Sequence, residues 1–300
     1  MDTQFNISDL PVLPEIITLL FNELSKEEPD TDKIISLIEK DPGFTIRLLK
    51  LANSAFYSPP EEITTVRKAV LFLGFNAIFA MLISIGLKKF MDIDLPYTDD
   101  KNNFWLHSLA SAVICREILQ YNTNAEIFKE LEPDEGYIGS LLHDIGKVFL
   151  YGKYKDKYKE YVERLGECKN YIECRELELE IFGITGAMVG EAIAKTWKLP
   201  STISKALSMD QGYKELEKIV EEIKDCISKE KIIIFIVSIA DFYSHKLGFN
   251  MFKGEVFDES KENIIERISK EYNFNIKFLI DKESDIKEKI LDFNNLLNSV

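Results

Sequence analysis

The chain has 300 residues and a net charge of −14, with 46% hydrophobic and 29% charged residues. These values are ordinary for a globular protein and leave room for one large domain or two smaller ones. Non-specific nucleic-acid binding depends on Lys and Arg side chains that displace phosphate counterions, so a chain this acidic is not expected to bind nucleic acid.

Helical signals dominate the first sixty residues. Apolar residues recur at helical spacing in 14–24, and Leu19 is among those expected to be buried. A second helix is expected in 30–40, where isoleucines share one face. Asp41, which a proline follows, is a typical N-cap for a third helix, on which Ile46 is expected in the core.

The next segment, 69–87, is uncharged over 19 residues, which is long enough to cross a bilayer. Its local chemistry divides it, however. Gly74 is a natural residue to end one helix, and Asn76 offers a fresh N-cap for another. We therefore expect two shorter buried helices joined at Gly74 and Phe75, and no membrane span.

The second half of the chain also shows helical patterns throughout. Helices are expected in 103–120, 136–154 with an interruption near Gly146, 173–183, 184–200, 199–207 and 231–248. The last of these is rich in β-branched residues and could be mistaken for a strand. Its length and apolar spacing favour a buried helix, and we expect Trp105 and Trp197 to be core residues.

The predicted fold class is all-α, because no alternating strand pattern occurs. The polar, acidic segment 91–103 contains a proline and is the best boundary between two helical halves. We therefore expect an N-terminal helical bundle in 1–95, packed on a second helical half in 96–250. A C-terminal extension in 251–300 is expected to add two helices on the outside.

The cysteines and the first residues bear on the compartment. Cysteine residues stand at positions Cys115, Cys168, Cys174 and Cys226, without a CxxC pair or zinc-finger spacing. They are expected to be free thiols in a reducing cytoplasm. The segment MDTQFNISDL has neither the basic start nor the apolar stretch of a secretory signal, so a cytoplasmic protein is expected.

A metal site is suggested by four residues that lie far apart in the sequence. His143 and Asp144 are adjacent, His107 lies in an apolar helix upstream, and Asp241 lies in the apolar segment SIADFY. Imidazole and carboxylate ligands together suit a divalent ion of moderate hardness. A carboxylate in so apolar a helix needs a partner, since burying an unpaired charge is costly, and a metal ion, an imidazolium or a capping interaction would each provide one.

The order of these residues resembles the H…HD…D signature of the HD phosphohydrolase superfamily. More specifically, the chain resembles the HDOD domain, the HD-related output domain of bacterial signalling proteins. The segments that carry this resemblance are LPVLPEII, EKDPGFTIRLLKLANSAFY, ITTVRKAVLFLGFNAI, FWLHSLASA, GSLLHDIGK, FGITGAMVGEAIAKTWKLP and VSIAD. They extend over roughly residues 8 to 248.

Three positions depart from the relatives that hydrolyse cyclic dinucleotides. Gly186 stands where those sequences often have a histidine, and Ser208 and Met209 stand where a His-His pair is expected. No GYP sequence follows. A two-metal mechanism needs ligands for both ions, so cyclic-dinucleotide hydrolysis of that type is not expected.

The resemblance implies that His107, His143, Asp144 and Asp241 hold one divalent ion (Fe, Mn, Ni, Co or Mg). It also implies that Lys147 faces a substrate phosphate in an active enzyme, although no general acid or base can be named.

The residues alone leave other interpretations open. The His-Asp pair could end a helix and hydrogen-bond within the core, and Lys147 could be a solvated lysine. His245, which follows Asp241 by one helical turn, is expected to be its solvent-side partner.

Two hypotheses of different class follow. The leading one is a signal-transduction protein that binds a protein partner or a small signalling ligand in the groove between its two halves, without turnover. The alternative is a mononuclear metal-dependent phosphohydrolase that acts on a nucleotide or another phosphate ester.

Overall fold

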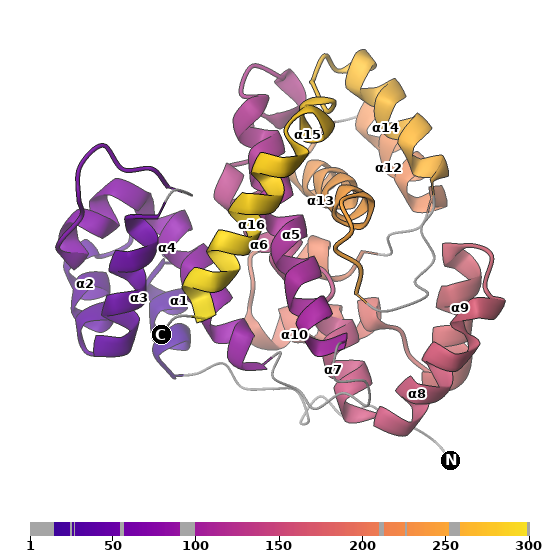
Figure 1. Cartoon of the computed structure of the whole chain (residues 1–300), viewed down its shortest axis with the longest axis horizontal. Coiled ribbons are helices and arrows are strands. Elements are labelled where there is room, and N and C mark those ends of the chain that lie inside the picture. Colours follow the sequence, from indigo (N-terminus) through magenta and orange to yellow (C-terminus); the bar gives the residue numbers. More distant parts are fainter. Residues whose placement is uncertain are drawn as a thin grey trace. The chain divides into compact units, whose positions relative to one another are not determined.

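The structure is a computed structural model that describes residues 15–24, 26, 28–54, 57–90, 100–209, 213–225, 227–251 and 259–298. Every regular element in these residues is a helix, so the predicted all-α class is confirmed. The chain divides into two compact units (Figure 1). We call residues 12–90 with 284–300 the N-terminal unit, and residues 1–11 with 91–283 the larger unit.

The N-terminal unit contains five helices within the described residues. They are α1 (Glu15–Leu24), α2 (Thr31–Glu39), α3 (Pro42–Ala52), α4 (Val66–Phe90) and the C-terminal helix α16 (Glu283–Asn298). The predicted N-cap is confirmed, because Asp41 Oδ1 accepts a hydrogen bond from Phe44 N at 2.9 Å. Helices α1, α2 and α3 each pack against α4.

Two expected core residues of this unit are exposed instead. Leu19 is 43% exposed and Ile46 is 49% exposed. Helix α3 buries Phe44, Leu48 and Leu51, which share one face because they are four and three residues apart. Ile46 lies between the first two and projects from the opposite side. The apolar spacing of the sequence correctly predicted a helix, but it assigned Ile46 to the buried face when this residue is exposed.

Helix α4 is interrupted at Gly74, which has a φ of 77° and a ψ of 171°. The two predicted helices therefore meet where the sequence indicated. Among the described residues, Val66–Ser84 is the one stretch long and apolar enough to cross a membrane, and 56% of it is buried inside the protein. Since the break leaves no continuous helix of about 20 residues, the core-helix interpretation fits this stretch better.

Replacing Gly74 by alanine is expected to lower the stability of the N-terminal unit by about 1–3 kcal/mol. The added Cβ would meet no atom within 4 Å, so the cost would come from the positive φ alone. Urea denaturation followed by circular dichroism would measure it. The control is Gly166→Ala, whose Cβ would also meet open space but whose φ is not positive. Equal midpoints for the two variants would contradict the prediction.

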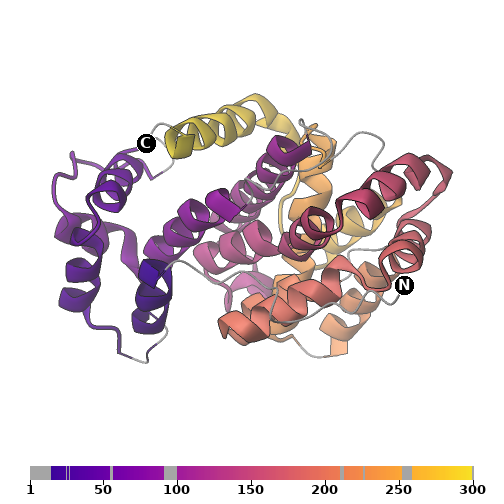
Figure 2. The ribbon, with the colours of Figure 1, turned by 90° about the horizontal axis from the view of Figure 1, so that it is seen from below.

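The larger unit is built around α5 (Asp100–Tyr121), α6 (Pro133–Leu142) and α13 (Lys229–Lys246), which pack against one another. Figures 1 and 2 both show α5 running beside α6. The helices α7 (Ile145–Lys153), α10 (Gly186–Trp197) and α11 (Ser201–Leu207) complete the core. The remaining elements of this unit are η2 (Glu126–Phe128), α8 (Lys155–Arg164), η3 (Leu165–Glu167), α9 (Tyr171–Phe182), α12 (Tyr213–Asp225), α14 (Ser260–Glu271) and α15 (Phe278–Asp281).

Several predictions for this unit are confirmed. The predicted segment 231–248 forms a buried helix, α13, as far as Lys246, and is not a strand. Gly183 ends α9 in the left-handed conformation. Trp105 and Trp197 are both buried. Of the cysteines, Cys115, Cys168 and Cys174 are free thiols, whereas Cys226 lies outside the described residues.

The helix break expected near Gly146 lies two residues earlier. Helix α6 ends at Leu142, and His143 and Asp144 form the junction with α7. Gly146 sits in the first turn of α7, where its backbone meets α10. A Cβ at this position would lie 2.0 Å from the carbonyl oxygen of Gly186 and 2.5 Å from the backbone nitrogen of Gly190. The glycine is therefore required by the close approach of two helices.

Candidate metal centre

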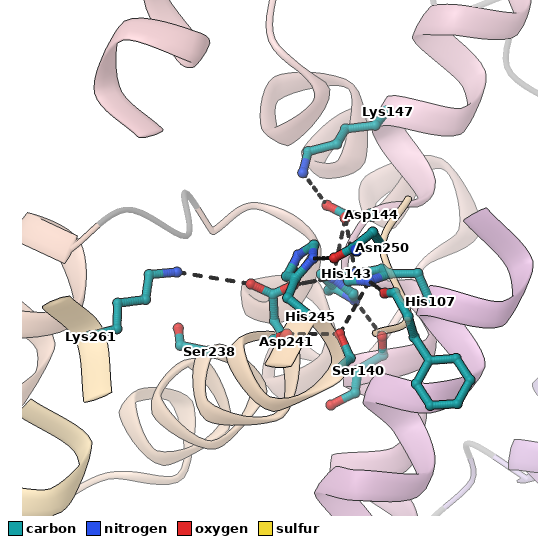
Figure 3. Close-up of polar contacts among 12 residues, drawn as sticks. His107, Ser140, His143, Asp144, Lys147, Ser238, Asp241, His245, Asn250 and Lys261 are labelled. Atoms are coloured by element: carbon teal, nitrogen blue, oxygen red, sulfur yellow. Dashed lines mark hydrogen bonds and ion pairs between the residues drawn. The ribbon is translucent and has the colours of Figure 1, made fainter. Parts of the chain in front are cut away.

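Three helical segments of the larger unit bring five polar side chains together (Figure 3). His107 comes from α5, His143 and Asp144 come from the α6–α7 junction, and Asp241 and His245 come from α13. The first four are buried. All four predicted ligands thus lie in one cluster, because α5, α6 and α13 pack against one another.

The ligand atoms of this cluster lie close to one another. His107 Nε2 and His143 Nε2 are 3.3 Å apart. Asp144 Oδ2 lies 3.7 Å from the first nitrogen and 3.2 Å from the second. Asp241 Oδ1 lies 3.3 Å from His107 Nε2 and 3.7 Å from His143 Nε2. It is also 3.3 Å from His245 Nε2, so this oxygen has three imidazole nitrogens around it.

Each of the three imidazoles is oriented by an oxygen that can only accept a hydrogen bond. His107 Nδ1 donates to the carbonyl oxygen of Phe249 at 2.9 Å, and His143 Nδ1 donates to that of Ser140 at 2.5 Å. His245 Nδ1 donates to Asn250 Oδ1 at 3.0 Å. Each Nδ1 therefore carries a hydrogen, and each Nε2 faces the cluster. Metal-binding histidines are held in this way by their outer partners.

The charges of the cluster shift the ionisation of its members. Burial lowers the pKa of His143, but the charge of Asp144 and hydrogen bonds to both carboxylates outweigh it and raise this pKa to about 10. Burial would raise the pKa of Asp144 and of Asp241. The neighbouring histidines, with Lys147 beside Asp144, instead hold both values below the usual range. Without a metal ion, the two carboxylates therefore favour the imidazolium form of His143.

Two lysines contact the outer oxygens of the same carboxylates (Figure 3). Lys147 Nζ lies 2.9 Å from Asp144 Oδ1, and Lys261 Nζ from α14 lies 3.9 Å from Asp241 Oδ2. Each carboxylate thus has one oxygen toward the imidazoles and one toward an ammonium group. Lys261 itself is buried, and its side chain also lies over the ring of Tyr171.

The donor atoms fit a divalent metal ion. Ligands bound at about 2.0–2.2 Å lie about 2.8–3.6 Å apart at right-angle or tetrahedral positions, and the donor atoms here are 3.2–3.7 Å apart. Asp144 Oδ2 is buried and faces the Nε2 atoms of His143 and His107 at 3.2 and 3.7 Å. Two overlapping sets of three could hold an ion, namely His107, His143 and Asp144, and His107, Asp241 and His245. Imidazole with carboxylate suits Mn, Fe, Co or Ni better than Mg.

The sequence missed or misread three residues at this site. His245 was expected to be the solvent-side partner of Asp241. The pairing is present, at 3.3 Å, but the side chain is only 11% exposed and its ring lies 4.6 Å from that of His107. Lys147 is not a solvated lysine, because its side chain is 17% exposed and pairs with Asp144. The sequence did not indicate that Lys261 belongs to this site, because its distance to Asp241 depends on how α14 folds back.

The positions expected for a second ion hold no ligand. A Cβ on Gly186 would lie 2.4 Å from Cγ of Lys147, so the lysine stem occupies that space. The Ser208 hydroxyl donates to the carbonyl oxygen of Lys205 at 3.2 Å, and Met209 is buried. That the chain holds one ion stays a prediction.

Comparison with known proteins gives a family match and several relatives. The model of the HDOD domain matches residues 10–212. An uncharacterised protein of Treponema pallidum is 22% identical over 222 residues, which are 74% of this chain and 41% of that protein. The uncharacterised protein YuxH of Bacillus subtilis is 30% identical over 105 residues, 35% of this chain and 25% of that protein. The chain therefore spans less than half the length of either relative.

Solved structures share the fold. An HDOD domain protein of unknown function from Geobacter sulfurreducens has a TM-score of 0.69 and 25% identity, covering 94% of this chain and 92% of that one. A protein of Marinobacter aquaeolei, whose description suggests signal transduction, has a TM-score of 0.67 and 16% identity, covering 98% and 62%. A protein of Shewanella amazonensis, described as resembling a metal-dependent phosphohydrolase, has a TM-score of 0.57 and 18% identity, covering 81% and 80%.

Proposed function

Because this chain belongs to the HDOD domain family, we propose that it works in bacterial signal transduction by binding, with one divalent ion at the His-Asp cluster and without turnover. The bound partner, a signalling protein or a small ligand, stays a prediction. So does its place in a groove between the two halves.

The burial of the donor atoms is the observation that carries this proposal. His107, His143, Asp144 and Asp241 are all buried. Structural metal sites are closed by protein ligands, whereas catalytic sites keep an open position for water or substrate. A closed set of His and Asp ligands is therefore better suited to fixing the arrangement of α5, α6 and α13 than to turnover.

A mononuclear phosphohydrolase is the second candidate, and Lys147 favours it. Its ammonium lies 2.9 Å from Asp144 Oδ1 and could bind a phosphate oxygen next to the ion. The description of the Shewanella protein supports the same idea. A bound ion would supply Lewis-acid chemistry and lower the pKa of a bound water. In this candidate, the chain's own groups would hold the ion and orient the phosphate.

Metal analysis combined with a hydrolysis screen would distinguish the binding protein from the phosphohydrolase. We expect the purified protein to bind about one Mn²⁺ or Co²⁺ ion per chain, and His143→Ala to lose it, because the Nε2 lone pair is gone. Across nucleotides and phosphodiesters, neither protein should show turnover. The control is Asp156→Asn, an exposed carboxylate on α8 that should leave metal binding unchanged. Turnover that His143→Ala abolishes would overturn the proposal in favour of the phosphohydrolase.

A further inference from the structure

We infer that His245 is a ligand of the metal ion, an inference that rests on the proposed metal site. The residue lies one turn after Asp241 on α13, so both side chains project from the same face of the helix. It is not one of the four residues of the H…HD…D signature, and its position was revealed only by the packing of α13 against α5.

The orientation of the ring is the first argument. Asn250 Oδ1 accepts the hydrogen of His245 Nδ1 at 3.0 Å, which turns Nε2 toward Asp241 Oδ1 at 3.3 Å. His107 has the same arrangement, with Phe249 accepting from its Nδ1 and its Nε2 also 3.3 Å from Asp241 Oδ1. Neighbouring residues of one segment, 249 and 250, thus orient two imidazoles toward the same oxygen.

The spacing of the rings is the second argument. Two imidazoles that bind one ion through Nε2 at about 2.1 Å have ring centres about 4.5–5.5 Å apart, for angles between 90° and tetrahedral. The centres of His107 and His143 are 5.3 Å apart, and those of His107 and His245 are 4.6 Å apart. Together with Asp241, His107 and His245 form a set of three whose ligand atoms all lie within 4.8 Å of one another.

The consequence concerns the coordination sphere. In an enzyme of the one-metal kind, a water or substrate takes the position left by the protein ligands. His245 would fill that position from within the chain. Its side chain is 11% exposed, which makes it the most exposed of the five clustered side chains. The ion would then be held by protein groups on the side where a substrate would otherwise enter.

An ion pair is the competing explanation, because an imidazolium at position 245 would also suit Asp241 at this distance. Proton NMR of the Co²⁺-loaded protein distinguishes the two. A histidine bound to Co²⁺ through Nε2 keeps its Nδ1 hydrogen, which gives a strongly shifted signal that disappears in D₂O. The chain has only three histidines, so the signals can be counted without ambiguity.

We expect three such signals in the wild-type protein and two in His245→Ala, with Co²⁺ affinity at least tenfold lower. His245→Gln serves as a second variant if the alanine variant fails to fold. Asn250→Ala, which removes only the acceptor, should keep three signals and weaken binding about tenfold. Two signals in the wild type that His245→Ala leaves unchanged would overturn the ligand role and leave the metal site intact. No Co²⁺ binding would overturn both.

Discussion

Replacing Gly146 by alanine is expected to lower the free energy of unfolding by about 3 kcal/mol, near the upper end for overpacked sites. The new Cβ would lie 2.0 Å from the carbonyl oxygen of Gly186 and 2.5 Å from the nitrogen of Gly190. Both contacts are with backbone atoms of α10, which cannot rotate away as a side chain can. Helices α7 and α10 must therefore separate, and Asp144, two residues away, must move with α7.

Thermal and urea denaturation of the metal-free protein would measure this loss. Gly166→Ala is the matched control, because its Cβ would meet no atom within 4 Å, and its stability should change by less than about 0.5 kcal/mol. Since Asp144 moves with α7, divalent-ion binding should weaken in Gly146→Ala as well. Wild-type stability in this variant would show that α7 and α10 do not approach as closely as described.

Asp241→Asn is expected to reduce the affinity for Mn²⁺ or Co²⁺ at least about a hundredfold, more than the change expected for an outer-shell partner. The amide has nearly the shape of the carboxylate but lacks its charge. Asp241 Oδ1 is the atom with three imidazole nitrogens within 3.3–3.7 Å, so its charge acts on the whole cluster. Isothermal titration calorimetry would measure the affinity.

The same variant has a second expected effect in the metal-free protein. Asp241 is one of two carboxylates that raise the pKa of His143 to about 10, so the pKa of His143 should fall in Asp241→Asn. An NMR titration of the imidazole would follow it. Asp156→Asn, an exposed carboxylate, should change neither the ion affinity nor this pKa. If Asp241→Asn left both quantities unchanged, Asp241 would not be part of the centre.

Local chemistry explains which parts of the fold could be predicted. Asp41 caps a helix by contacts within three residues, and Gly74 and Gly183 interrupt or end helices through their own backbone conformation. Such signals depend on neighbouring residues alone. The buried face of α3 depends on where α4 lies, which a single helix does not encode, and the misplaced Ile46 shows this limit.

The residues of the candidate site divide in the same way, into those that the sequence indicates and those whose position depends on tertiary packing. The four signature residues could be named because their types and order are written in the sequence. His245 was seen to share a face with Asp241, but its inward position depends on α5, which contributes His107, whose ring is tilted by 40° to that of His245. Lys261 comes from α14, beyond the residues that the HDOD model matches, and its approach to Asp241 depends on tertiary folding alone.

The contact between Lys147 and Gly186 makes these two positions epistatic. The lysine stem fills the volume into which any side chain at 186 would project. A histidine placed there, to rebuild a second ion site, would displace the Lys147 ammonium. Asp144 would then lose its ion pair with Lys147. The two changes would have to be made together, with a smaller residue at 147. A substitution at 186 alone would therefore be destabilising even if the same side chain could be accommodated together with a smaller residue at 147.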